Sequence, residues 1–560
     1  MASSQFPFDE NRKVPATLEQ FVQYQILETI RRQPEPKALD PQLLLVCGRR
    51  AAEIKARLPQ YQNSRKDFAQ LTAMRHVLLW RTFPFNDLPV EIVSNIFRYA
   101  VWSSANSPEG ILLRFRLTWV CRRWRNIATC DQTLWNTIWF KDAKVGYQLS
   151  KLYFERAGTT TLDLRIEDDS KTRLIQDQPM TGDDMERVLD IIMSKSSQIR
   201  MIIVVVELWP PVLVLLDRLH RTSQSLQQLE RVEVHRTGRP YQWDGPHYPL
   251  GDYEHALTLC NGRTERVNFL CLNGVHIDWE TSYITNLVNL DLRRMPPELG
   301  PSLERFRCVL ESSPKLKKLS LDGAGPIMPT GWATHSYPPV FLPRLETLIL
   351  GDCAVTYAIF CAGIIHAPGV RELIVLNFRG PDHTPVLQAL TGKFPELLII
   401  SVFSLDIRKS PWSRRIVVRW LLSIPKIKFM RVGMMKATLM AHFFLDGRLH
   451  IDDDIPLTLT PEEENAILAN GSRIILCPEL EAFEGQHIDV DTMVQFIYGR
   501  KKFGVPLRKL YIHQNWLQDM TPDEKNKIQE QGYEHDFIDV TVPMSTTPYE
   551  RSLWKQLRGG

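Results

Sequence analysis

The sequence predicts an α+β multidomain protein, in which a small all-helical module precedes a curved α/β repeat array with parallel strands on its concave face. Three observations support this fold class. The chain has 560 residues, 44% hydrophobic and 24% charged, which is globular composition with length for several cores. Apolar residues at helical spacing cluster before residue 140. From about residue 160 a strand-like apolar pattern recurs every 25 to 30 residues.

Residues 1–80 are predicted to form an N-terminal leader with helical segments. Apolar residues at helix-like spacing predict helices over Phe21–Arg32 and Pro41–Leu58, with the breaker Pro34-Glu-Pro36 between them. The opening residues MASSQFPFDENRK contain no apolar core, so we expect no secretory signal there. No residue of the leader carries recognisable chemistry, and the sequence does not give its role.

A compact helical module is predicted over residues 83–140. Pro89 fits the first turn of a helix, in which Leu88, Ile92 and Ile96 are spaced by four. Residues 103–110 are polar with a proline and a glycine, which predicts a loop. A second helix follows, with these residues on one face: Leu117, Val120, Cys121, Trp124 and Ile127. Leu134-Trp135 opens a third short element, and a module this small and apolar extends its core into a neighbour or partner.

Repeats fill residues 150–515, which leaves 516–560 as a C-terminal tail. The pattern apolar-x-x-apolar-x-apolar has its middle residues at 290, 319, 348, 373, 400 and 430, separated by 29, 29, 25, 27 and 30. A proline stands two residues before most copies, where it ends a helix and favours an extended strand. Repeats of this length with a leucine-spaced strand and a helix are leucine-rich repeats, which stack into a solenoid. The alternative is one α/β domain with coincidental periodicity.

Charge and motif content argue against several other classes. Lys and Arg number 68 and Asp and Glu number 64, so the net charge of +4 gives no reason to expect a nucleic-acid partner. The apolar run Met201–Val206 is too short to span a bilayer, so we expect no membrane partner. Without a metal-ligand, phosphate-loop or nucleophile motif, we expect no metal, no cofactor and no catalytic residue. Nine cysteines without a Cys-x-x-Cys pair favour a reducing compartment, cytoplasmic and/or nuclear.

The helical module carries a specific motif. It reads Leu88-Pro89-x-Glu91-Ile92-x-x-x-Ile96-Phe97, then Val120-Cys121-Arg122-x-Trp124-Arg125-x-Ile127-Ala128, then Leu134-Trp135, and it resembles the F-box. The loop at 100–114 is longer than in the shortest F-boxes and is similar to the long-loop form in large fungal families, which also place leucine-rich repeats after the F-box. The resemblance covers residues 83–515 and implies a small all-helical F-box followed by an α/β leucine-rich-repeat solenoid.

The resemblance implies the substrate-recognition subunit of an SCF-type cullin-RING E3 ubiquitin ligase. Such a subunit docks onto a Skp-family adaptor, and through it onto cullin and RING subunits, while its repeats capture a target protein. It makes no bonds itself, so the resemblance implies no enzyme activity. Two other hypotheses stay open: a non-ligase protein-interaction scaffold built on the repeat solenoid, and an enzyme that uses aromatic loops of the repeats.

The adaptor-binding residues are expected within the F-box motif. Those that form or support this face are Leu88, Pro89, Ile92, Ile96, Phe97, Val120, Cys121, Trp124, Leu134 and Trp135. Buried aromatic residues are frequent anchors at interfaces, although Ile96 and Trp124 fit interior packing equally well. The cluster Arg122, Arg123 and Arg125 is expected to be a solvated helix face.

Target-binding residues are expected between the buried leucines of the strands and in aromatic insertions. Side chains alternate along a strand, so inward leucines leave the residues between them on the concave surface. The candidates are Asp291, Arg293, Asp322, Phe403, Arg431, Tyr511, His513, Trp243, Trp332 and Tyr337. Their mixed chemistry names no ligand, and the aromatic loops could equally pack onto the repeats. The acidic insertion at 451–471 is expected to be a solvated face.

Overall fold

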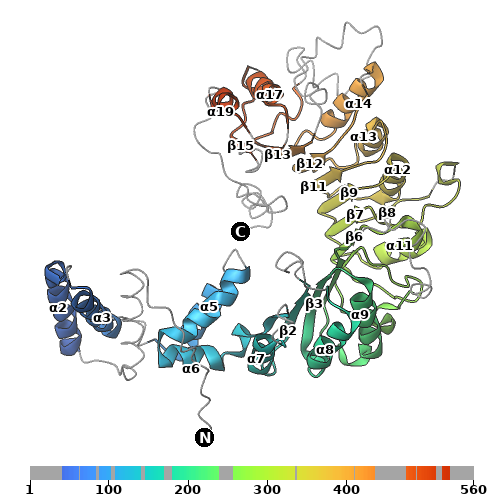
Figure 1. Cartoon of the computed structure of the whole chain (residues 1–560). Helices are drawn as coiled ribbons and strands as arrows, with labels where there is room; N and C mark the ends of the chain where they lie inside the picture. Colours follow the sequence, from blue (N-terminus) through green and yellow to red (C-terminus); the bar gives the residue numbers. More distant parts are fainter. Residues whose placement is uncertain are drawn as a thin grey trace. The chain divides into compact units, whose positions relative to one another are not determined.

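The structure is a computed structural model. It describes residues 41–61, 64–82, 88–102, 107–140, 146–168, 179–238, 256–334, 337–408, 410–434, 475–486, 488–502, 504–512 and 520–529. The chain divides into two compact units, Met1–Asp163 and Leu164–Gly560. Figure 1 labels their helices and strands.

The first unit begins with a pair of helices. α2 (Pro41–Arg57) and α3 (Arg65–Thr82) flank the 3-10 turn Leu58–Tyr61. Small residues at helical intervals are buried on both helices: Cys47, Ala51, Ala69 and Ala73. The predicted helix at Pro41–Leu58 is confirmed, whereas the one predicted at Phe21–Arg32 lies outside the described residues.

Three helices form the module predicted at residues 83–140. They are α4 (Val90–Trp102), α5 (Ser107–Val120) and α6 (Arg122–Cys130). The predicted second helix is two helices, because Cys121 between α5 and α6 has an extended backbone, with φ −157° and ψ 174°. The predicted loop over 103–110 is too long, since α5 already begins at Ser107.

The third element of the module is a short turn and a strand. The 3-10 turn Gln132–Leu134 leads into β1 (Thr137–Phe140), and α7 (Gln148–Arg156) follows. The chain then enters the second unit at β2 (Leu162–Glu167).

A sheet whose neighbouring strands follow one another in the chain forms the second unit. Its strands are β2, β3 (Ile199–Val206), β4 (Arg231–Arg236), β5 (Phe269–Asn273), β6 (Asn289–Arg293), β7 (Lys318–Asp322), β9 (Thr347–Gly351), β11 (Glu372–Leu376), β12 (Ile399–Phe403), β13 (Phe429–Gly433), β14 (Ala482–Gln486) and β15 (Lys509–Ile512). From β3 to β15 each pairs in parallel with the next. A small second sheet pairs β8 (Val340–Phe341) with β10 (Ile365–His366).

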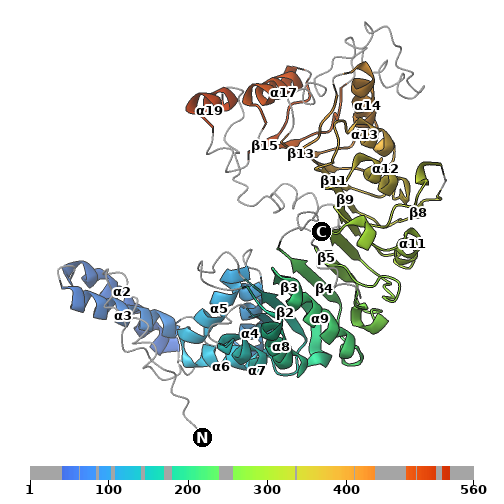
Figure 2. The ribbon, with the colours of Figure 1, turned by 45° about the vertical axis from the view of Figure 1, so that its right-hand side comes forward.

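Helices connect many of these strands. They are α8 (Gly182–Met193), α9 (Trp209–Arg221), α11 (Leu303–Glu311), α12 (Val355–Gly363), α13 (Thr384–Leu390), α14 (Pro411–Leu422) and α17 (Val490–Lys502). The helix α19 (Pro522–Gln529) follows the last strand. α12, α13 and α14 lie side by side along one side of the sheet (Figure 2). The segment 274–288 between β5 and β6 contains no α-helix, so the predicted strand–loop–helix unit is not uniform.

The predicted repeat pattern marks the strands of this sheet. The residues at 290, 319, 348, 373, 400 and 430 each occupy the second position of a strand. All are at most 1% exposed, and the strand register pairs each with the next. An apolar row therefore crosses the sheet, and it forms the core together with the helices.

The strand ends share a second regularity. The residue after each of seven strands has a positive φ: Gly274, Arg294, Gly323, Asp352, Asn377, Ser404 and Met434. Its N–H donates to the last carbonyl of the next strand, as from Arg294 to Asp322 at 2.8 Å and from Ser404 to Gly433 at 3.0 Å. The left-handed conformation favours glycine, so the non-glycine residues are held there by the ladder they extend.

No helix among the described residues is both long and apolar enough to cross a bilayer. The acidic insertion at 451–471 lies outside those residues. Within the predicted tail, 516–560, they include α19.

Candidate functional site

The helix α4 carries apolar residues on two faces. Val93, Phe97 and Val101 are at most 2% exposed and form its inner face. Ile92, Ile96 and Tyr99, at intervals of four and three, are 45%, 40% and 77% exposed and form what we call the outer stripe. An exposed stripe of this kind on a folded module is characteristic of an interaction surface.

The start of α4 is fixed by the neighbouring helix. The carbonyl of Pro89 accepts hydrogen bonds from the N–H groups of Ile92 and Val93, both at 3.1 Å. The Arg123 guanidinium on α6 donates to the Leu88 carbonyl at 2.5 Å. Leu88 is half-buried and Pro89 is exposed, so this bond holds the Leu-Pro segment in place beside the outer stripe.

Two of the three clustered arginines therefore have structural partners. Besides the bond from Arg123, Arg125 donates through Nε to the Thr118 carbonyl at 2.9 Å. The prediction of a solvated basic face is wrong for Arg123, which is half-buried and bonds a carbonyl outside α6. Arg122 and Arg125 are exposed, as expected of a solvated face.

The junction of α5 and α6 depends on Cys121. Its thiol caps α6 by accepting from the Trp124 N–H at 3.4 Å, and its side chain is buried. The Trp124 ring packs against Phe97 on α4, with ring centroids 4.9 Å apart. Cys121, Trp124 and Phe97 thus support the outer stripe from within, and Val120 beside them is half-buried.

Leu134 and Trp135 form the buried base of the module, with no exposed surface. The Trp135 indole donates to the Ala128 carbonyl at 2.7 Å. Its ring lies 5.2 Å from the Tyr153 ring, and the Arg156 guanidinium lies 4.6 Å from its centroid. The tryptophan therefore joins α6 to α7, and these two predicted residues act through support rather than through exposed contact.

An ion pair ties α4 to the turn before Trp135. Arg98 donates to both carboxylate oxygens of Asp131, at 2.8 and 3.1 Å. Thr133 donates to the same carboxylate from its N–H and hydroxyl, at 3.1 and 2.7 Å. Burial opposes the charge on Asp131, but the hydrogen bonds from Arg98 and Thr133 outweigh it and hold the pKa below its usual value.

Sequence reasoning missed a buried arginine on α5. Arg114 is 1% exposed, donates to the Thr137 carbonyl at 2.9 Å, and lies 4.9 Å from the Trp102 ring and 5.6 Å from the Tyr153 ring. Burial lowers the pKa of Arg114 to about 10. The charge is held over aromatic faces. The same apolar segment contains Arg116, which is exposed, so the sequence alone did not distinguish the two arginines.

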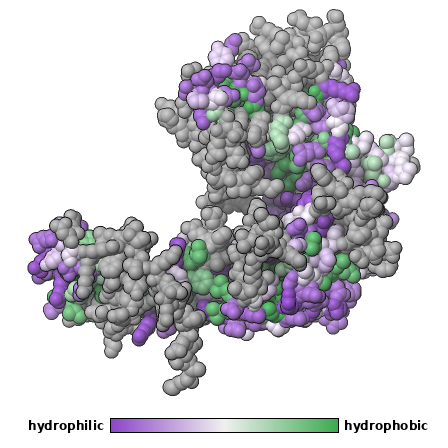
Figure 3. Space-filling view, viewed as in Figure 1, coloured by the Kyte–Doolittle hydropathy of each residue, from purple (hydrophilic) through white to green (hydrophobic). Residues whose placement is uncertain are grey.

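The sequence motif also missed three exposed apolar residues outside the outer stripe. Trp102, Leu112 and Trp119 are 44%, 52% and 51% exposed. Apolar surface gathers over α5 in the space-filling view (Figure 3). The apolar surface of this module is therefore wider than the outer stripe.

The predicted target-binding residues of β6 and β7 are largely engaged with one another. Asp291 is 4% exposed and accepts two hydrogen bonds from Arg293, both at 2.7 Å. Asp322, on the next strand, is half-buried. Burial, together with the negative charges of Asp352 and Asp291, raises the pKa of Asp322.

A second internal pair lies near the other end of the sheet. Arg431 on β13 donates to Glu484 on β14 at 2.8 Å and to the Ser401 hydroxyl at 3.2 Å. The two charged side chains are 11% and 4% exposed. Phe403 is half-buried and Tyr511 is fully buried, so Phe403 offers contact surface and Tyr511 does not.

The aromatic insertions are described only in part. Trp332 packs against Phe360 with ring centroids 5.6 Å apart, and Tyr337 is half-buried. Trp243 and His513 lie outside the described residues. For Trp332, packing onto its own unit is what the structure shows.

Comparison with known families gives one match. Residues 85–141 match the family model described as F-box-like. A comparison with curated proteins found no significant match. The matched segment contains α4, α5, α6 and β1, together with the outer stripe, and it supports an F-box protein. F-box domains bind Skp-type adaptors and place their proteins in SCF ubiquitin ligases, as adaptors that are typically non-catalytic.

Proposed function

We propose that this chain is the substrate-recognition subunit of an SCF-type cullin-RING ubiquitin ligase. Its F-box would bind a Skp-family adaptor, and its parallel sheet would bind a target protein. The observation that carries the proposal is the outer stripe of Ile92, Ile96 and Tyr99, which lies on the segment that matches the F-box-like family.

The adaptor face follows from what is exposed and what holds it. Complete burial of an isoleucine contributes about 1.5–3 kcal/mol, so burial of the exposed part of Ile92 or Ile96 contributes on the order of 1 kcal/mol each. Leu88 and Pro89 extend this surface, and Trp124 and Phe97 keep it rigid from below. A rigid apolar surface loses little conformational entropy when it binds.

We further propose that the second unit is a leucine-rich-repeat solenoid that carries the target-binding surface. Three features support this: parallel strands in chain order, a buried apolar residue at the second position of each strand, and a left-handed residue after seven of them. The surface would be the concave side, where the side chains between the leucines lie. On that side the residues from β4 to β7 are mostly polar, whereas β11 and β12 contribute apolar residues such as Ile374 and Phe403.

In this role the chain supplies proximity rather than chemistry. A target held beside a ubiquitin-charged conjugating enzyme reacts at a raised effective concentration. This role places the protein in the cytoplasm and/or the nucleus.

The test is capture of a Skp-family adaptor by the co-expressed full-length chain. We expect wild type to capture adaptor, and with it cullin, whereas Ile92→Glu combined with Ile96→Glu loses at least about 100-fold in affinity, since two buried carboxylates cost about 3 kcal/mol or more. The matched control is Ile327→Glu in the second unit, because Ile327 is also 40% exposed.

Folding of each variant is checked by circular dichroism. A folded wild-type chain that captures no adaptor would overturn the proposal. Capture of adaptor without cullin would instead identify an interaction scaffold that does not serve a ligase.

A further inference from the structure

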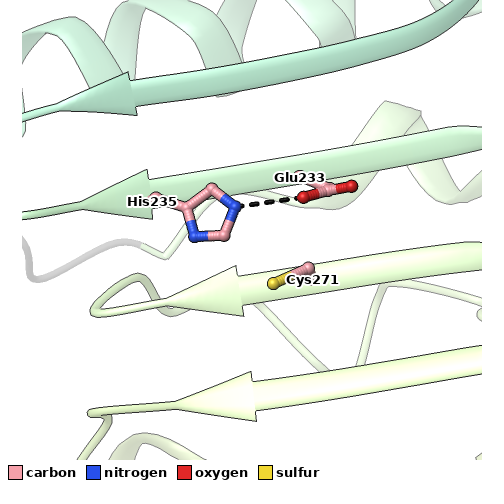
Figure 4. Close-up of side chains that lie close together, drawn as sticks. All are labelled: Glu233, His235 and Cys271. Atoms are coloured by element: carbon pink, nitrogen blue, oxygen red, sulfur yellow. Dashed lines mark hydrogen bonds and ion pairs between the residues drawn. The ribbon is translucent and has the colours of Figure 1, made fainter. Parts of the chain in front are cut away.

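Three side chains with metal-binding atoms meet on one face of the sheet of the second unit. Glu233 and His235 are two residues apart on β4, so they point to the same side. Cys271 on β5 is the register partner of Glu233. One ligand atom from each lies within 4.8 Å of the others, and Figure 4 shows the three side chains together across the two strands.

The distances are close to those of a tetrahedral site. The His235 Nε2 atom is 3.1 Å from the Glu233 Oε2 atom. Zinc–ligand bonds of about 2.0–2.3 Å at a tetrahedral angle separate neighbouring ligand atoms by about 3.3–3.8 Å. The cluster therefore needs about 1 Å of side-chain closure to surround one ion, and the backbone can stay in register.

The donor types select the class of ion. A thiol, an imidazole and a carboxylate are together the ligands of zinc and related divalent transition metals, whereas magnesium and calcium prefer oxygen alone. Three protein ligands leave a fourth position for water. Among the residues that the structure describes, no other group of three such side chains comes this close.

The residues around the cluster also fit a metal site. The Asn273 amide lies 3.4 Å from His235 Nδ1, and the Asn273 oxygen is buried without a hydrogen-bond partner. A half-turn of the amide brings that oxygen to Nδ1, where it accepts the imidazole proton and leaves Nε2 for a metal. Arg231 bonds the other oxygen of Glu233, Oε1, so Oε2 faces the cluster.

We propose that Glu233, His235 and Cys271 form a binding site for one zinc-class divalent cation, oriented by Asn273. A bound ion would join β4 to β5 through side chains, at the polar end of the sheet face. The inference does not depend on the proposed ligase role, because it rests on the second unit alone. The site could not be read from the sequence, which predicted no metal, because Cys271 is 36 residues from His235.

The test is titration of the chelator-treated full-length chain with Co²⁺ as a spectroscopic probe. We expect one equivalent to produce a thiolate-to-cobalt charge-transfer band together with the visible bands of four-coordinate cobalt, both removed by Zn²⁺. Cys271→Ser should abolish the charge-transfer band, and Asn273→Ala should weaken binding about 10-fold.

The matched control is Cys353→Ser, which alters another buried cysteine that belongs to no such cluster; it should keep the band. His235→Ala provides a second variant if Cys271→Ser fails to fold, and it should lose at least the same 10-fold. Cobalt spectra without a thiolate band in the folded wild type, or a band that survives in Cys271→Ser, would overturn the site.

Discussion

Two surfaces differ in how many partners their side chains already have within the protein. One is the outer stripe of the F-box, and the other is the face of the second unit's sheet that carries the side chains between the buried leucines. Ile92 and Ile96 are well exposed, so burial of their side chains against another protein would be favourable through the hydrophobic effect. On the strand face, Arg293 and Arg431 already bond carboxylates of their own unit. Under the proposed function, an adaptor would bury apolar surface that is already exposed, whereas a target would have to compete with internal pairs or use the apolar positions between them.

This contrast explains why one surface is recognisable from sequence and the other is not. The spacing of apolar residues predicts an exposed apolar stripe on a small helical module, because the core of so small a module cannot bury all of them. A charged residue on a strand gives no such sign, because its partner sits on the same strand or a neighbouring one.

The largest effect is expected at the buried base of the module. Trp135→Ala removes a fully buried ring and its hydrogen bond to the Ala128 carbonyl, and should lower the free energy of unfolding by about 3–5 kcal/mol. Chemical denaturation followed by near-UV circular dichroism measures it. Trp119→Ala, at a half-exposed position, is the control and should cost less than about 1 kcal/mol; equal losses would contradict the assignment of Trp135 as an internal support.

The second effect concerns the pair between β13 and β14. Arg431→Ala leaves Glu484 buried without its ion-pair partner, and should destabilise the second unit by about 3 kcal/mol. The double variant Arg431→Met with Glu484→Leu removes both charges and should recover much of that loss. If the double variant is as unstable as the single one, the pair is not the source of the effect.

The third effect depends on pH. Asp131→Asn weakens charged hydrogen bonds from Arg98 and Thr133, and should cost about 1.5–3 kcal/mol at neutral pH. The pKa of Asp131 is lowered in the folded protein. Its contribution is therefore present above the unfolded-state pKa of about 3.9 and is lost as the pH falls through the folded-state value.

Unfolding free energies of wild type and Asp131→Asn across this acid range measure the dependence. The difference between them should shrink as the pH falls. Asp217→Asn, in an exposed pair with Arg221, is the control and should cost under about 1 kcal/mol. A difference for Asp131→Asn that stays constant with pH would show that its charge is not the cause.

The smallest effect concerns the strand ends. Ser404→Gly relieves a left-handed backbone, with φ 52°, and should stabilise the second unit by about 0.5 kcal/mol after the entropy of glycine is included. Gly323→Ala, at φ 62°, should destabilise it by about 1 kcal/mol. Thermal unfolding of both variants measures the effects, and shifts in the same direction would contradict the shared role of these positions.

Much of the fold was predictable because buried apolar residues repeat. The residues at 290, 319, 348, 373, 400 and 430 lie in strands as predicted, since alternation places them in the core. The break at Cys121 was not predictable, because a thiol cap interrupts a helix whose apolar spacing continues across it. The pairing of Arg431 with Glu484 was not predictable either, because the two residues are 53 positions apart and only the register joins them.

The candidate site was also predictable only in part. The spacing of Leu88, Ile92 and Ile96 identified the outward face of α4, but the sequence could not separate exposed Ile96 from buried Phe97 beside it. Tyr99, 77% exposed, continues the outer stripe and was missed, since the pattern was matched to the motif alone. Exposure depends on which face α5 and α6 cover, and that is a property of the packed module.

The most direct measurement is the affinity of the purified full-length chain for a purified Skp-family adaptor, with wild type compared with Ile96→Glu by calorimetry. We expect a one-to-one complex with wild type and at least about 10-fold weaker binding for the variant, whose unfolding free energy should stay near that of wild type. A folded wild-type chain that does not bind, or a variant that binds equally well, would contradict it.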